Sequence, residues 1–263
     1  MTILEILLWG WLGTGLLMLV LWMIQRARGD ASLVDAGWAA GLGAMAVACA
    51  ALGPGDASRR LLLGTLAGLW GGRLAVYLLL NRVVGKPEDG RYRKLRESWG
   101  PRAQPYFFAF FQVQAMLDVL FALPFAAVAF NAVPGPTALD LAGAAVILVS
   151  IAGESLADAQ LAAFRRDPAN RGRTCRRGLW RYSRHPNYFF EWMHWFAYPL
   201  MAVGSPYWAL SLAGPLLMSF FLFKVTGIPA TEAQALASRG DDYRDYQRTT
   251  SAFFPWFPKG PRS

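Results

Sequence analysis

Charge, cysteine and histidine are all scarce in this chain of 263 residues. Charged residues make up 16% of the sequence and hydrophobic residues 55%, whereas a soluble domain usually has about 25% charged residues. The two cysteines, Cys49 and Cys175, fall in an apolar run and in a polar loop, so no disulfide is expected between them. Together with His185 and His194 they form no metal-ligand spacing, and we expect no bound metal.

The chain also lacks two patterns that would point to other classes of protein. No Gly-x-Gly-x-x-Gly fingerprint follows a strand, and the sequence leaves no room for a Rossmann domain. A nucleotide would therefore have to be held by helix ends and loops. No repeated halves with broken helices in matching positions stand out, which argues against a transporter.

Long apolar runs are the main feature of the sequence. Each is close to 20 residues, the length that crosses a hydrocarbon layer of about 30 Å. No Lys or Arg precedes the first run, so we read it as a membrane helix and not as a cleaved signal. The sequence predicts one all-α domain over residues 1–263, a polytopic integral membrane bundle of about seven transmembrane helices. The runs cover 3–24, 33–52, 61–80, 106–130, 138–157, 188–204 and 207–226.

Positive charge is concentrated on one side of these runs. The net charge is +9, and only Arg59 and Arg60 lie on the opposite side. The positive-inside rule therefore places the N-terminus outside and the C-terminus in the cytoplasm. The concentration of Lys and Arg on one side of the membrane also accounts for the net charge, so we expect no nucleic acid partner. Most of the 26 Lys and Arg residues lie in the polar segments 81–105, 158–187 and 227–263.

Several ionisable residues interrupt the apolar runs. Each costs about 2.5–3.5 kcal/mol inside the hydrocarbon layer, so such residues normally face the interior of a bundle. They either tie helices together or line a cleft that opens to the cytoplasm. Their concentration next to the two most basic loops favours a cleft with an anionic ligand at its mouth. The residues are Asp35, Arg73, Asp118, Glu154, Asp158, Glu191 and Lys224.

The segment 184–188 places a cation, an imidazole, a proline, an amide and a phenol at the start of a helix. The unpaired N–H groups of a helix N-terminus favour an anion such as a phosphate. The alternative for the basic loop is that its arginines gather near anionic lipid. That alternative suits Arg171, Arg173, Arg176 and Arg177 better than it suits Arg184 and His185.

The stretch 178–192, Gly-Leu-Trp-Arg-Tyr-Ser-Arg-His-Pro-Asn-Tyr-Phe-Phe-Glu-Trp, resembles the signature of the steroid 5-alpha-reductase superfamily. It most resembles the bacterial branch that is filed as a domain of unknown function. Further segments fit the same branch, so the resemblance covers nearly the whole chain. These segments are 32–35, 88–92, 154–160, 227–232, 243–246 and 254–256.

The resemblance implies a multi-pass enzyme of the bacterial inner membrane that binds NADPH mostly through residues 150–263. It implies hydride transfer to the activated C=C bond of a lipophilic enone, either 3-oxo-Δ4 steroid-like or isoprenoid. We expect membrane lipid and this lipophilic small molecule as partners, and a monomer. The residues expected to contact the cofactor are Asp158, Arg165, Arg184, His185, Asn187, Tyr188, Glu191, Tyr243 and Arg244.

Two residues are candidates for the chemistry at the substrate. Such a reaction needs a hydrogen-bond donor on the carbonyl oxygen, where negative charge develops. Tyr77 is the best donor on the third predicted helix, and Asp35 is the only acid on the second. The Gln-Glu pair that steroid reductases carry on the second helix is missing here. Asp35 therefore either assists Tyr77 or only ties helices together.

Two other functions fit parts of the same sequence. Isoprenylcysteine carboxyl methyltransferases share the Arg-His-Pro-x-Tyr element, and Glu232, Tyr243 and Tyr246 would also suit their S-adenosylmethionine. The number of arginines in the loop before Gly178 favours a cofactor with phosphates instead. A non-enzymatic protein that binds lipid or sterol would explain the 11 Trp and 17 Phe residues, although aromatic belts at the membrane surface also explain them.

Overall fold

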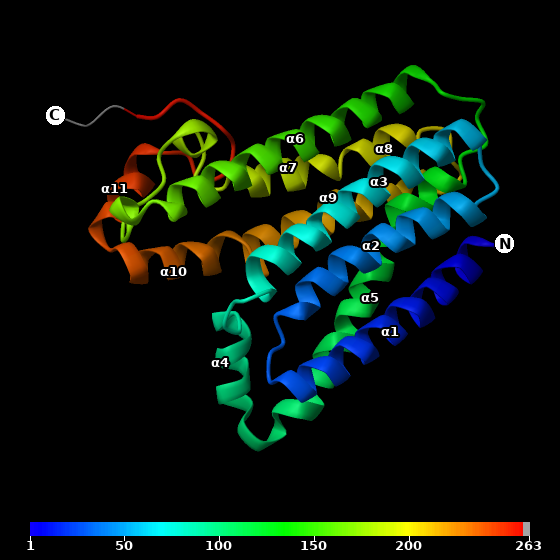
Figure 1. Cartoon of the computed structure of the whole chain (residues 1–263). Coiled ribbons are helices and arrows are strands. Elements are labelled where there is room, and N and C mark those ends of the chain that lie inside the picture. Colours follow the sequence, from blue (N-terminus) through cyan, green and yellow to red (C-terminus); the bar gives the residue numbers. More distant parts are fainter. Residues whose placement is uncertain (260–263) are drawn as a thin grey trace. The chain divides into compact units, whose positions relative to one another are not determined.

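The computed structural model describes residues 1–259, and every regular element within them is a helix (Figure 1). The all-α prediction is confirmed. The chain forms two compact units, which we describe separately. Unit 1 comprises Met1–Leu141 and Tyr198–Gly214, and unit 2 comprises Ala142–Ala197 and the chain from Pro215 onward.

Six helical stretches are long and apolar enough to cross a membrane. The chain is therefore a multi-pass integral membrane protein, as its apolar runs predicted. The stretches are Ile3–Arg28, Leu33–Leu52, Ala57–Val83, Gly90–Ala129, Ala138–Arg166 and Trp208–Arg239.

The predicted membrane helix over 188–204 is wrong as a single element. Its residues form α7 (Pro186–His194) and α8 (Ala197–Met201), each too short to cross a bilayer alone. Pro199 explains the break, because it has no N–H for an α-helical bond to the carbonyl of Trp195 and its ring would crowd that carbonyl. This apolar run therefore contributes no long helix of its own to the six stretches described above.

Three helices lie in segments that the apolar runs left as loop and tail. These are α4 (Gly90–Trp99), α10 (Ile228–Arg239) and α11 (Asp241–Thr249). A π-helical turn, Phe221–Val225, connects α9 (Ala213–Phe220) to the segment before α10. In α11 only Tyr243 and Tyr246 are buried, and their spacing of three puts them on one face of the helix.

Close contact between backbones defines the core of unit 1. Its long helices are α1 (Ile3–Arg28), α2 (Leu33–Leu52), α3 (Ala57–Leu78) and α5 (Ala103–Ala129). A Cβ atom at Gly71 of α3 would lie 2.6 Å from the Gly43 Cα atom and 2.9 Å from the Ala39 carbonyl oxygen of α2. Small residues at such a crossing let membrane helices pack at short range.

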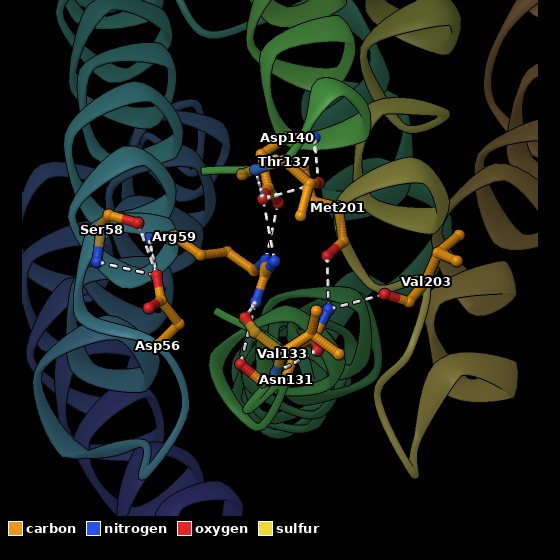
Figure 2. A network of polar contacts seen from close by, with 9 residues as sticks. All are labelled: Asp56, Ser58, Arg59, Asn131, Val133, Thr137, Asp140, Met201 and Val203. Carbon is orange, nitrogen blue, oxygen red and sulfur yellow. Dashed lines mark hydrogen bonds and ion pairs between the residues drawn. The ribbon is translucent and has the colours of Figure 1, made fainter. Parts of the chain in front are cut away.

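A buried polar network joins several segments of unit 1 (Figure 2). Arg59, near the start of α3, donates from Nε to Asp140 Oδ1 at 2.6 Å and from Nη2 to Asp140 Oδ2 at 2.8 Å. Asp140 belongs to the first turn of α6 (Ala138–Arg166), and both side chains are only 1% exposed. Asn131 accepts at its carbonyl from Arg59 and donates from Nδ2 to the carbonyls of Met201 and Val203. We call this set the Arg59–Asp140 network.

Candidate functional site

A single carboxylate collects four side chains in unit 2. Glu232, in the first part of α10, accepts from Arg184 Nε at 2.7 Å and from Gln247 Nε2 at 2.9 Å. His185 Nε2 lies 3.3 Å from the Glu232 Oε1 atom, and the Tyr243 hydroxyl donates to the same oxygen at 3.4 Å. We call these five residues the Glu232 cluster. It joins the loop before α7 to α10 and α11.

Arg184 bonds protein groups through two of its three guanidinium nitrogens. Besides the Nε bond to Glu232, its Nη1 atom donates to the carbonyls of Gln247 and Thr250 at the end of α11. The last carbonyls of a helix have no partner within the helix, and a cation there is favourable. The side chain is 10% exposed, and these bonds fix the end of α11.

The start of α7 brings further predicted residues together in unit 2. Asn187 Nδ2 donates to Asp158 Oδ1 of α6 at 3.2 Å. The Tyr188 hydroxyl shares a hydrogen bond of 3.0 Å with Thr231 Oγ1, and its ring stacks on the His185 imidazole with centroids 5.3 Å apart. Glu191 follows Asn187 by one helical turn. Asp158, His185, Asn187 and Tyr188 thus belong to one connected region, and their role in binding a cofactor stays a prediction.

A hollow of about 410 Å³ opens in unit 2, between the loop after α6 and the start of α11. We call it the arginine hollow. Arg176 donates to Asp242 at 3.2 Å and to Asp245 at 2.7 Å, so its charge is compensated. Within residues 1–259, Arg173 and Arg177 are exposed and form no ion pair. Its lining residues are Phe164, Asn170, Arg173, Thr174, Arg176, Arg177, Asp242 and Asp245.

Thr174 adds an unused hydroxyl to the arginine hollow. The residue is 7% exposed, and its Oγ1 atom has no hydrogen-bond partner among the described residues. Its N–H group donates to Asp242 at 2.7 Å, so the backbone of the loop is fixed at this point. A buried hydroxyl without a partner is uncommon and calls for an explanation. An oxygen-rich anion held by Arg173 and Arg177 would supply its partner.

The ionisation of the groups around the hollow follows from their contacts. Hydrogen bonds from Arg176 and Arg248 lower the pKa of Asp245, so this carboxylate stays charged. Burial raises the pKa of the Cys175 thiol although Arg177 and Arg165 lie near it. Burial, followed by the charge of Glu232, raises the pKa of Tyr243 to about 12. Tyr243 therefore remains a neutral phenol that can donate a hydrogen bond.

Two of the residues expected to contact the cofactor, Arg165 and Arg244, form no hydrogen bond or ion pair with the Glu232 cluster or the start of α7 within residues 1–259 and do not line the hollow. Arg165, in the last turn of α6, is exposed and does not line the hollow. Arg244 forms an exposed pair with Asp241 at 2.7 Å, in which the two side chains are 65% and 94% exposed. Arg244 lies one residue after Tyr243 on α11, so the helix directs the two side chains to different faces.

The two candidates for substrate chemistry belong to unit 1. Asp35 accepts from the Tyr92 hydroxyl at 2.5 Å and from Arg91 Nη2 at 2.6 Å, and Arg82 Nη1 lies 3.5 Å away. These contacts tie α2 to α4, a helix that the sequence did not predict. Tyr77 packs against a cluster that includes Ala36, the residue after Asp35. Tyr77 therefore lies at the contact between α2 and α3, whereas the contacts of Asp35 are with Arg82, Arg91 and Tyr92.

Sequence reasoning missed Gln247 and Thr174. Gln247 follows Tyr243 by four residues, so the helical period of α11 would have placed both side chains on one face. Nothing in the sequence marks Thr174, because its role depends on burial. Among residues 1–259, no group of three or more His, Cys, Asp or Glu side chains could hold a metal ion.

Comparison with known proteins gives one match. No curated protein and no solved structure matches the chain. The family described as "Protein of unknown function (DUF1295)" matches residues 21–250, which include most of both units. This match confirms the part of the resemblance that concerned a domain of unknown function, and the wider superfamily link stays a prediction. The chain therefore belongs to the DUF1295 family.

Proposed function

We propose that this protein is an NADPH-dependent reductase of the bacterial inner membrane. It would transfer hydride to the activated C=C bond of a lipophilic substrate, such as a 3-oxo-Δ4 steroid-like or isoprenoid enone. The observation that carries the proposal is the arginine hollow of unit 2. Among the described residues, it has two guanidinium groups without an ion pair beside a buried hydroxyl without a hydrogen-bond partner. Guanidinium groups and hydroxyls are the usual partners of phosphate oxygens.

The residues of unit 2 fit the two ends of such a cofactor. Arg173, Arg177 and Thr174 would hold phosphate groups. Asn187 and Tyr188, at the start of α7, supply an amide and a phenol that can hydrogen-bond a sugar or a ring amide. NADPH would supply the hydride when bound.

The chain's own contribution to the chemistry lies in unit 1. The hydroxyl of Tyr77 would donate a hydrogen bond to the carbonyl oxygen, where negative charge develops during hydride addition. Asp35 is held by Arg91 and Tyr92 and would keep α2 in place beside α4. Asp35 is therefore a positioning residue in this proposal.

The Glu232 cluster keeps one alternative open, an S-adenosylmethionine-dependent methyltransferase. A carboxylate can bind the amino group of that cofactor. Four donors from the chain already surround the two oxygens of Glu232, which leaves few positions for a ligand. S-Adenosylmethionine also has no phosphate that would use Arg173 and Arg177.

Ligand-dependent stability of the full chain in detergent tests the proposal. We expect NADPH to raise the Tm of the purified protein and S-adenosylmethionine to leave it unchanged, because a ligand stabilises only the fold that binds it. The variant Arg173→Ala/Arg177→Ala should lower the affinity for NADPH at least about tenfold. Arg28→Ala/Arg102→Ala is the matched control, because it removes two exposed charges from unit 1.

The outcomes separate the candidate functions. Stabilisation by S-adenosylmethionine alone would overturn the reductase in favour of the methyltransferase. No response to either cofactor would favour a protein that binds lipid without catalysis. An equal loss of NADPH binding in the control variant would show that net charge, and not the arginine hollow, attracts the nucleotide.

A further inference from the structure

Residues 251–258 form no helix or strand, yet hydrogen bonds fix their path in unit 2. The Ser183 hydroxyl donates to the Phe253 carbonyl at 2.7 Å, and the Trp256 N–H group donates to the Tyr182 carbonyl at 2.9 Å. We call residues 251–258 the aromatic tail. Because its backbone is bound at two points, the fold decides which of its side chains are buried and which are exposed.

Phe253 brings the aromatic tail back to an apolar stretch of the chain. The residue is buried, and its ring meets the Phe223 ring edge to face, with centroids 4.9 Å apart. Phe223 belongs to the stretch Trp208–Arg239, which is long and apolar enough to cross a membrane. Trp192 of α7 packs against the same side of the tail, with its centroid 5.5 Å from that of Phe253. The tail therefore lies against a membrane-spanning part of unit 2.

The other large side chains of the aromatic tail are exposed. Phe254, Trp256 and Phe257 are 58%, 72% and 75% exposed. Contact with lipid explains exposed apolar residues on membrane helices, but the tail lies outside the six long stretches. Large apolar patches in contact with water are unusual and mark interaction sites. Aromatic side chains are enriched where a membrane meets water, so these three rings fit that position.

A second hollow of unit 2, of about 320 Å³, lies beside the aromatic tail, and we call it the tail hollow. Arg181 is exposed, and within residues 1–259 its side chain forms no ion pair or hydrogen bond. Lys259 is also exposed and without an ion pair in that range, and its N–H group donates to the Thr249 carbonyl at 2.8 Å. The tail hollow is lined by Arg176, Arg181, Thr249, Thr250 and Pro258.

The combination of cations and aromatic rings selects the kind of molecule that would fit. A guanidinium group binds phosphate oxygens well. A soluble phosphate compound would use the cations and leave the rings exposed, whereas an uncharged lipid would cover the rings and leave the cations without a partner. The positive-inside rule predicts that residues 227–263 are cytoplasmic, and anionic lipids give that leaflet a negative surface potential. An anionic phospholipid satisfies both parts.

We propose that the aromatic tail and the tail hollow bind an anionic phospholipid of the cytoplasmic leaflet. Arg181 and Lys259 would bind its phosphate group, and Trp256 and Phe257 would lie between the headgroups and the acyl chains. The tail hollow and the arginine hollow have only Arg176 in common, and acidic residues of α11 compensate its charge. The inference does not depend on the proposed reductase.

Two lipids with the same acyl chains test the inference on the full chain in detergent. We expect dioleoylphosphatidylglycerol to raise the Tm more than dioleoylphosphatidylcholine does. A cation near an anionic membrane strengthens binding about fivefold, so Arg181→Gln/Lys259→Gln should weaken binding of phosphatidylglycerol at least about tenfold. Arg166→Gln/Arg171→Gln is the matched control, because it removes two exposed charges of unit 2 that line neither hollow.

Three outcomes of these titrations would overturn the inference. Equal responses to the two lipids would show that the headgroup is not recognised. An equal loss in both double variants would show that net charge, and not the tail hollow, attracts the lipid. Stabilisation by sn-glycerol 3-phosphate to the same extent as by phosphatidylglycerol would indicate a site for a soluble phosphate compound.

Fluorescence in vesicles tests the aromatic tail separately. The difference between the original chain and Trp256→Phe gives the emission of Trp256, and the backbone bond of this residue survives the substitution. We expect brominated phosphatidylcholine to quench this emission and aqueous acrylamide to leave it nearly unchanged. Trp180→Phe is the control, because the Trp180 indole is buried and donates to the Ala157 carbonyl. Quenching of the Trp256 emission by acrylamide alone would place the tail in water and overturn the inference.

Discussion

At the residue scale, Glu232 connects more of unit 2 than any sequence motif indicates. Its carboxylate is 16% exposed and is bound by side chains from the loop before α7 and from α11. Glu232→Ala leaves the guanidinium of Arg184 without its charge partner. Since breaking a buried pair from one side costs about 3–5 kcal/mol, we expect a loss near the lower end of that range, measured by thermal unfolding.

Tyr243→Phe is the matched control for this prediction. It removes only the donor of the 3.4 Å bond to Glu232 and keeps the ring in place. Its effect should be under about 1 kcal/mol, because a long hydrogen bond contributes little. An equal Tm for Glu232→Ala and the original chain would show that the cluster does not stabilise unit 2.

Asp56 gives a pH dependence of stability in unit 1. Its carboxylate accepts from the Ser58 hydroxyl and from the N–H groups of Ser58 and Arg59 at the start of α3. The hydrogen bond from Ser58, followed by that from Arg59, lowers the pKa of Asp56 to about 2. A lowered folded pKa means that the stabilisation is complete above the unfolded value near 3.9 and is lost as the pH falls toward 2.

The variant Asp56→Asn checks this pH dependence. Asparagine still caps a helix but carries no charge to lose. The difference in Tm between the original chain and Asp56→Asn should shrink as the pH is lowered from about 5 to about 2. If the difference in Tm between the two proteins stays constant over this pH range, the negative charge of Asp56 contributes nothing to stability.

Some of the site could be predicted at this scale. Arg184, His185, Asn187 and Tyr188 were predictable because they are consecutive at a helix start, where local chemistry decides what they can bind. The isolation of Asp118, whose carboxyl oxygens have no hydrogen-bond partner among residues 1–259, was not predictable, because it depends on which atoms of α2 face it.

At the scale of elements, the Arg59–Asp140 network fixes α3 to the start of α6 inside unit 1 (Figure 2). Arg59→Met leaves the Asp140 carboxylate buried without its guanidinium. We expect a loss of about 3–5 kcal/mol in the free energy of unfolding. The double variant Arg59→Met/Asp140→Leu should recover part of that loss, since it removes both charges, and a thermodynamic cycle measures the coupling. If the loss in the double variant equals the sum of the losses in Arg59→Met and Asp140→Leu, the two side chains are not coupled and the ion pair is contradicted.

The contact between α2 and α3 can be tested with two adjacent glycines. Gly71→Ala places a methyl group 2.6 Å from the Gly43 Cα atom and should cost about 1–3 kcal/mol. Gly72→Ala meets nothing within 4 Å and should be neutral or stabilising, because alanine favours helix. Thermal unfolding of both variants checks the prediction, and an equal loss in both would exclude close packing as the cause.

The limits of hydropathy as a guide also appear at this scale. The long helices of unit 1 were predictable because each is an apolar run of about membrane length with few charged residues. The run over 188–204 was misread because hydropathy does not register the missing N–H of Pro199. The helices α4 and α11 were missed because charged residues cover their exposed faces and lower the mean hydropathy over any window. The helix α10 was missed because polar and small residues, such as Gln234 and Ser238, lower its mean hydropathy.

At the scale of the whole molecule, the charge distribution makes a prediction about topology. An N-terminus outside and a C-terminus in the cytoplasm require an odd number of membrane crossings. The six long stretches therefore need one more crossing, and we expect the segment from α7 through α8 to provide it. Reporter proteins inserted after Arg171 and fused to the C-terminus should be cytoplasmic, and one inserted at Ser205 should be outside. A C-terminal reporter on the outer side would contradict this topology.

The class of the molecule was predictable from composition and run length alone, because only helices of this length satisfy their backbone within a bilayer. The division of the molecule into two units was not predictable from composition or run length. Residues 198–214 belong with the N-terminal helices although they follow α7 in the chain, and such long-range contacts leave no local signal.

The two cysteines have a practical consequence for this kind of mapping. Cys49 and Cys175 are free thiols that are 0% and 2% exposed, in unit 1 and unit 2 respectively. Thiol reagents react with an accessible thiolate, and burial denies them both the access and the charge. The natural chain should therefore stay nearly unlabelled by a membrane-impermeant maleimide. A single cysteine introduced at a loop position could then report which side of the membrane it occupies, with both native cysteines left in place.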